Sequence, residues 1–96
     1  MAVSTGEILA QVRRSVRQSY PKEPGRPAQV LRGVEQALAA GWEVKTRGTA
    51  KIEGRWLWAI LVQAATSARP STEMAALLKS SGFVRTTNHA WAYPLT

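Results

Sequence analysis

Few side chains in this sequence could carry out acid–base, nucleophilic or metal chemistry. The chain has one histidine, His89, no cysteine, and six acidic residues that are all glutamate. A metal site or a nucleophilic triad needs several such groups close together, but the glutamates are scattered from Glu7 to Glu73 and form no evident acid–base dyad. A glycine-rich phosphate loop is also absent from the sequence. We therefore expect no catalytic residue, no metal and no cofactor, and we interpret His89 as a turn residue beside Asn88.

Basic side chains dominate the charge of the chain. Lysine and arginine number 13 against six glutamates, and the formal net charge is +7. The excess is spread along the chain, because residues 1–36 carry six basic and three acidic groups and residues 37–96 carry seven and three. A field of this sign attracts polyanions at long range. The charge therefore favours nucleic acid as a partner, and solubility alone is the other explanation.

Two rows of basic residues could follow a phosphate backbone. The predicted helix at the start of the chain carries three arginines on its outer side, and the alternating segment Trp42–Glu53 projects three basic residues together from one face of a strand. A further arginine follows in the next turn. A solvated helix or sheet face would explain these rows equally well. The candidate nucleic-acid-binding residues are Arg13, Arg14, Arg17, Lys45, Arg47, Lys51 and Arg55.

Tryptophan is the commonest aromatic residue, with four copies against two tyrosines and one phenylalanine. Trp91 and Tyr93 stand two residues apart on a terminal strand, and we name them as candidate aromatic contacts for unpaired bases. A place in the core is the alternative for both. Trp56 and Trp58 have the same spacing and, if exposed, could also stack on unpaired bases, but they belong to an apolar run, so we expect them in the core, with Trp58 beside Ile60.

One domain must position these residues, because 96 residues leave no room for a second core. Residues 1–20 predict a basic amphipathic helix, since apolar side chains recur at helical spacing from Ile8 to Tyr20. Ser4 or Thr5 can cap this helix, and Glu7 lies in its first turn, where a negative charge is favoured. Residues 21–27 form a proline-rich connector. Residues 28–96 form an α+β core.

The sequence after the connector alternates between helical and strand patterns. The segment around Gly48 could be a β-bulge or a tight turn. The predicted elements are a helix from Pro27 to Gly41, strands over Trp42–Glu53 and Trp56–Val62, a helix that Ser71 caps and Gly82 ends, and short strands over Phe83–Thr87 and Ala90–Tyr93. The expected fold is therefore α+β, a small antiparallel sheet with helices packed on one face, in the order α-α-β-β(-β)-α-β(-β).

Two stretches, "LAAGWEVKTRGTAKI" and "RPSTEMAALLKSSGF", carry a resemblance over residues 30–83. The order of helix, glycine and aromatic, strands and closing helix resembles the double-stranded RNA-binding fold, and within it the small HicA-type toxins. That family has Gly-Ser-His where this chain has Gly48-Thr49-Ala50. The catalytic histidine of the family is thus lacking, so the resemblance implies RNA binding without cleavage.

These observations predict a small basic binding protein that is not an enzyme and that contacts RNA or DNA through phosphates. Two alternatives stay open: a protein-interaction module that regulates or inhibits an acidic or nucleic-acid-handling protein, and a small-ligand binder with a tryptophan-lined pocket. The longest apolar run, residues 56–62, is too short to cross a bilayer. With no secretory signal and no cysteine, we expect a cytoplasmic location and no membrane partner.

Overall fold

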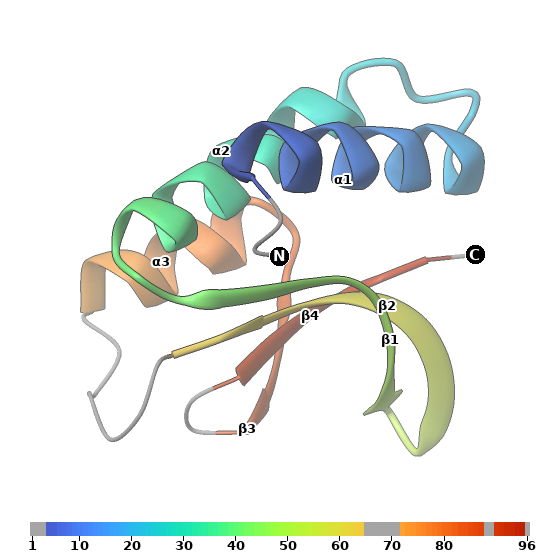
Figure 1. Cartoon of the computed structure of the whole chain (residues 1–96). Helices are drawn as coiled ribbons and strands as arrows, with labels where there is room; N and C mark the ends of the chain where they lie inside the picture. Colours follow the sequence, from blue (N-terminus) through green and yellow to red (C-terminus); the bar gives the residue numbers. More distant parts are fainter. Residues whose placement is uncertain (1–3, 65–71, 88–89, 96) are drawn as a thin grey trace.

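Helices cover one face of an antiparallel sheet in the computed structural model, which describes residues 4–64, 72–87 and 90–95 (Figure 1). Within these residues the sheet has four strands in the order β1-β2-β4-β3. The architecture confirms the predicted α+β class and order of elements. The elements are α1 (Thr5–Ser19), α2 (Arg26–Ala39), β1 (Glu43–Ile52), β2 (Arg55–Gln63), α3 (Thr72–Ser80), β3 (Val84–Thr87) and β4 (Ala90–Pro94).

The first helix forms where its capping residues and apolar spacing predict it. The side chain of Ser4 accepts a hydrogen bond from the backbone N–H of Glu7 at 3.2 Å, which satisfies one of the free donors of the first turn. Val12 and Val16 are fully buried against the rest of the core. The three arginines of the helix are exposed. Helix α1 therefore turns its apolar side inward and its basic side to solvent.

A proline and a glycine delimit the second helix. Pro27 occupies its first turn, where the missing N–H costs no hydrogen bond. Gly41 has a φ of +82°, a conformation that suits glycine, and it lets the backbone N–H of Trp42 donate to the carbonyl of Ala37 at 2.9 Å. Helix α2 thus ends close to the residue that the sequence predicts.

A polar and aromatic cluster ties the connector to the last strand. The Arg26 guanidinium donates hydrogen bonds of 2.8 Å to the Tyr93 hydroxyl and to the Glu23 carboxylate. It also lies over the ring of Tyr20, 4.0 Å from the centroid. The Tyr20 hydroxyl in turn donates to the carbonyl of Pro94 at 2.7 Å. These contacts fix the end of α1 and the start of α2 against β4.

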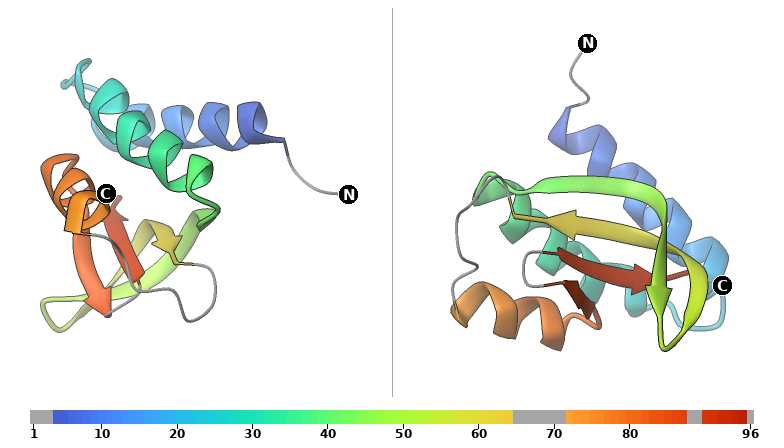
Figure 2. Two further views of the ribbon diagram at one scale, coloured as in Figure 1. Left: turned by 90° about the vertical axis from the view of Figure 1, so that its left-hand side faces the viewer. Right: turned by 90° about the horizontal axis from the view of Figure 1, so that it is seen from below.

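The predicted irregularity in β1 is a bulge. The register with β2 shifts between Lys45 and Gly48. Before the shift Val44 pairs with Val62 on the helix-covered face, whereas after it Gly48 pairs with Ala59 on the opposite face. Beyond the bulge β1 bends, and the β1–β2 hairpin curls across the open face of the sheet (Figure 2). A small second core forms beneath the curl.

Strand β2 is covered on both faces over only part of its length. Residues 59–62 are buried or half-buried, and Ile60 is fully buried as predicted. Trp58 is 52% exposed and Trp56 is 70% exposed, so the expectation that they belong to the core is wrong. Both residues lie on the β1–β2 hairpin, which bends away from the helices (Figure 1) and leaves their side chains only partly covered.

Strand β4 buries the two aromatic residues that we expected as base contacts. Trp91 is 7% and Tyr93 is 2% exposed, so neither ring is available for stacking and this prediction is wrong. The reason is the strand order, because β4 lies between β2 and β3 and its inward-facing side chains pack beneath the helices.

The third helix closes the core at the other end of the sheet. Leu78 is fully buried, and Gly82, with a φ of +98°, ends the helix. Two strands, β1 and β2, separate α2 from α3 within the described residues. The predicted cap Ser71 and the predicted turn at Asn88 and His89 lie outside the described residues. None of the helices in the described ranges is both long enough and apolar enough to span a membrane.

Candidate functional site

An arginine and a tryptophan form a stacked pair on the surface. The Arg47 guanidinium lies over the indole of Trp58, with its central carbon 4.6 Å from the ring centroid. Arg47 comes from the bulge of β1 and Trp58 from the adjoining part of β2. Such a cation–π contact contributes about 0.5–1 kcal/mol at an exposed site. The pair presents an aromatic ring and a restrained positive charge to solvent.

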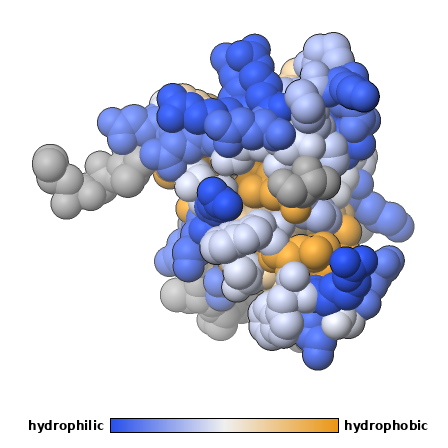
Figure 3. Space-filling view, turned by 90° about the vertical axis from the view of Figure 1, so that its right-hand side faces the viewer, coloured by the Kyte–Doolittle hydropathy of each residue, from blue (hydrophilic) through white to orange (hydrophobic). Residues whose placement is uncertain are grey.

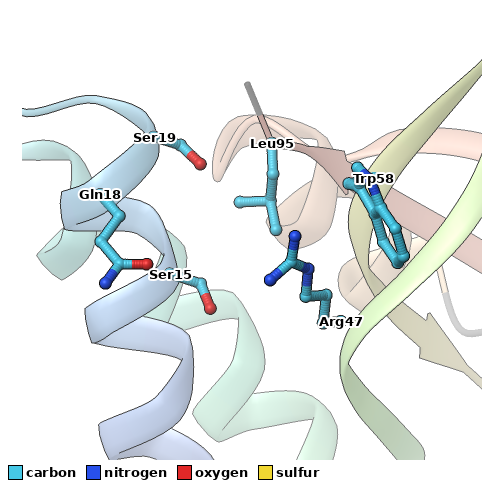
Figure 4. Close-up of a pocket in the computed structure, with 6 residues that line it drawn as sticks. All are labelled: Ser15, Gln18, Ser19, Arg47, Trp58 and Leu95. Carbon is cyan, nitrogen blue, oxygen red and sulfur yellow. The ribbon is translucent and has the colours of Figure 1, made fainter.

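This pair borders a hollow between the sheet and the second half of α1. Figure 4 shows Arg47 reaching into the space between the helix and the Trp58 ring. The Thr46 hydroxyl donates to the Gln11 side chain at 3.0 Å, and the Leu95 N–H donates to the Trp58 carbonyl at 2.8 Å, which hold the walls in place. The lining residues are Ser15, Gln18, Ser19, Arg47, Trp58 and Leu95.

The arginine row of α1 adjoins this hollow. Arg13, Arg14 and Arg17 line a shallow depression on the outer side of the helix together with Gln18. Because Gln18 lines both depressions, the two are neighbours on the surface. Figure 3 shows this side of the molecule, with hydrophilic side chains across the top, where the helices lie, and paler and hydrophobic side chains beneath them. The structure therefore links the depression of the helical row to the hollow of Arg47 through one shared residue, Gln18, as the sequence could not show.

Lys51 and Trp56 extend the same face along the hairpin. Lys51 pairs with Trp56, and two residues away Thr49 pairs with Trp58. Paired residues of an antiparallel ladder share a face, and so do residues two apart. Lys51 and Trp56 are both exposed. Trp58, Trp56 and Lys51 thus form one surface, which begins at the hollow.

Two other predicted residues lie on the opposite face. Lys45 pairs with Leu61. Its side chain lies beside Gly48 on that face, because its Cδ is 3.3 Å from the position that a Cβ on Gly48 would take. Arg55 pairs with Ile52, which belongs to the second core. The prediction that the strand's three basic residues project together is therefore wrong. The bulge adds one residue to β1, and this reverses the facing of every residue after it.

The arginines of this surface have no acidic partners in the part of the chain that the structure describes. The one salt bridge shown there joins Arg26 to Glu23, at 2.8 Å, and lies in the connector. Four cations, those of residues 13, 14, 17 and 47, are exposed without a carboxylate beside them. Their charge remains available to an anionic ligand.

The described residues bring together no group of three or more histidine, cysteine, aspartate or glutamate side chains that could hold a metal ion. The single histidine, His89, lies outside the described residues. The chemistry that the surface can offer is thus electrostatic attraction, hydrogen bonding and stacking.

Sequence reasoning missed Trp56 and Trp58 as surface residues and Gln18 as the link between the two depressions. One signal could have identified the tryptophans. They follow directly after the turn at Glu53 and Gly54, and residues next to a hairpin turn lie at the periphery of a sheet. No comparable signal exists for Gln18, because its neighbours come from distant parts of the chain.

Comparison with protein-family models, with curated proteins and with solved structures finds no match for this chain.

Proposed function

We propose that the protein is a non-enzymatic nucleic-acid-binding protein that holds a phosphate backbone along α1 and Arg47. The observation that carries this proposal is that Gln18 lines both the hollow that Arg47 borders and the depression of the α1 arginine row, with no carboxylate beside the four cations among the described residues. Guanidinium groups bind phosphate oxygens with strong, directional hydrogen bonds.

Binding of this kind would be driven mainly by counterion release. Each phosphate that a guanidinium neutralises releases condensed cations from the nucleic acid, so affinity falls as salt rises. Four contacts imply a log–log slope of about −3.6 on duplex DNA and about −2.8 on a single strand. Contacts to phosphates position the protein without reading sequence, so little sequence preference is expected.

A titration of labelled oligonucleotides over a range of salt concentrations tests the proposal. The variant Arg14→Gln/Arg17→Gln should weaken binding and make the slope shallower by about 1.4 on single strands, because two contacts are lost. The matched control is Lys22→Gln/Arg32→Gln, which removes the same charge from exposed positions outside the two depressions. It should leave the slope nearly unchanged.

Three results would contradict the proposal. An affinity that does not depend on salt would exclude phosphate neutralisation as the mechanism. Equal effects of the two double variants would mean that net charge alone, and not this surface, attracts the oligonucleotide. Failure to bind any oligonucleotide would favour the acidic-protein alternative, because the same cations suit that partner.

A further inference from the structure

Two large aromatic side chains lie in solvent at one end of the sheet. Trp56 and Trp58 are 70% and 52% exposed, whereas Trp91 is buried in the core. An exposed aromatic pair on a small protein commonly marks a contact site, since water is a poor environment for an indole face.

The two indoles are placed as successive contacts along a strand. They are two residues apart on β2, so they share a face and their Cα atoms are separated by about 6.6 Å. Their cross-strand partners are polar, Thr49 opposite Trp58 and Lys51 opposite Trp56. The indoles are therefore surrounded by hydrogen-bonding and charged groups instead of a larger apolar patch.

The charges around the indoles indicate the ligand. The Arg47 guanidinium lies over the Trp58 ring, and Lys51 pairs with Trp56 in the strand register. Each aromatic ring thus has a basic residue as a neighbour, and Gln18 joins the hollow that Trp58 lines to the depression of the α1 arginine row. This alternation of aromatic rings and cations suits a ligand in which flat groups, which can stack on the rings, are joined by phosphates, which the cations can bind.

We propose that Trp58 and Trp56 stack on unpaired bases, so that the ligand is a single-stranded nucleic acid whose backbone continues along the arginine row. This inference rests on the proposed function and names its substrate class. In a duplex, each base is stacked on its neighbours in the same strand at a spacing of about 3.4 Å. An indole therefore cannot reach the face of a base there. The Cα atoms of the two tryptophans are separated along β2 by about twice that spacing. Stacking on both indoles therefore requires bases that are already unstacked from each other.

Arg47 positions the Trp58 ring and supplies charge beside it. A guanidinium held 4.6 Å from the ring centroid restricts the rotation of the indole, and its free N–H groups remain within reach of a phosphate next to a stacked base. Stacking of one base on one aromatic ring strengthens binding by about 5- to 150-fold.

The experiment compares a single strand with a duplex of the same sequence, at several salt concentrations, for three variants. Trp58→Ala should lower affinity for the single strand by about tenfold or more, with the salt slope unchanged and the duplex affinity unaffected. Trp58→Phe should retain most of the single-strand affinity, because it keeps an aromatic face. Val84→Ala is the matched control, since Val84 is also an exposed large apolar residue but lies on β3, and it should change neither affinity.

Tryptophan fluorescence supplies a second readout that does not depend on a label. Stacking of a base on an indole should quench its emission, so single-strand binding should quench the wild type more than Trp58→Ala. The far-UV circular dichroism spectrum and the melting temperature of each variant verify that it is folded before it is titrated.

The outcomes separate this inference from the function on which it rests. If Trp58→Ala binds single strands as tightly as the wild type while Arg14→Gln/Arg17→Gln still makes the slope shallower, the phosphate surface stands and base stacking is refuted. If the wild type prefers the duplex, stacking is refuted as well. If no oligonucleotide binds at all, both proposals fail.

Discussion

Replacement of Arg26 by alanine should destabilise the fold measurably, because this residue connects three parts of the chain. Its guanidinium donates to the Tyr93 hydroxyl at 2.8 Å, pairs with Glu23 at 2.8 Å and lies 4.0 Å from the ring centroid of Tyr20. The change to alanine removes all three contacts and leaves the hydroxyl of a buried tyrosine without this donor.

The magnitude follows from these contacts one by one. A hydrogen bond from a charged donor contributes about 1.5–3 kcal/mol. The ion pair contributes about 0.2–1 kcal/mol, because its partners are 33% and 51% exposed. The cation–π contact adds about 0.5–1 kcal/mol. Loss of a cation from the first turn of α2 acts in the opposite direction by about 0.3–1 kcal/mol, and the net loss of unfolding free energy should be about 3 kcal/mol.

Thermal and urea denaturation followed by circular dichroism measure this loss. A change of about 3 kcal/mol lowers the Tm of a domain of this size by about 12–24 °C. Arg32→Ala is the control, because Arg32 is an exposed arginine of the same helix, and it should change stability by less than about 0.5 kcal/mol. A double-mutant cycle of Arg26→Ala with Tyr93→Phe should give a coupling energy of about 1 kcal/mol or more.

A different set of results would refute this reasoning. If Arg26→Ala and Arg32→Ala had equal effects, the contacts of Arg26 would contribute nothing beyond a surface charge. If the cycle gave no coupling, the hydrogen bond to Tyr93 would not stabilise the fold.

Three further predictions concern stability. Gly82→Ala should cost about 2–4 kcal/mol, because φ there is +98° and a Cβ would lie 2.8 Å from Tyr93 Cε2; Gly54→Ala, at a φ of +79° with open space around it, should cost only about 1–2 kcal/mol in the same urea titration. Burial is the main cause that raises the pKa of Tyr20, and the neighbouring Tyr93 raises it further. The contribution of Tyr20 to stability is therefore present below the ordinary tyrosine pKa of about 10, and it is lost as pH rises through the higher pKa of the folded state. Melting temperatures of Tyr20→Phe should therefore fall less than those of the wild type at strongly alkaline pH, and equal declines would contradict this. Trp58→Ala should cost about 1–2 kcal/mol by thermal denaturation, well below the roughly 3–5 kcal/mol of a buried aromatic, because half of the side chain is exposed; a larger cost would mean that the ring is part of the core.

Local signals in the sequence predicted the elements well. Ser4 and Glu7 marked the start of α1, Pro27 marked the start of α2, and Gly41 and Gly82 marked helix ends. These signals work because capping, the lack of a proline N–H and positive φ involve only residues close together in the chain. These signals can therefore be identified in the sequence before any tertiary contact is known.

The choice of exposed aromatic residues could not be predicted in the same way. Trp58 and Trp91 both sit in apolar, strand-forming stretches, yet the first is half exposed and the second is buried. Both lie on inner strands, so what separates them is their position along the sheet: Trp91 pairs with the buried Val62, whereas Trp58 pairs with Thr49 on the β1–β2 hairpin, which bends away from the helices. Neither property is a function of the residues near each tryptophan.

The candidate site shows the same division between sequence and tertiary structure. Composition and helical spacing determined that the chain is basic and that Arg13, Arg14 and Arg17 form an exposed row, because charge and a 3.6-residue period are properties of the sequence itself. Only the tertiary structure decided that Arg47 lies over Trp58 at the hollow beside α1, whereas Lys45 lies on the opposite face. A one-residue bulge in β1 reverses which side chains face the helices, and its position depends on the pairing with β2.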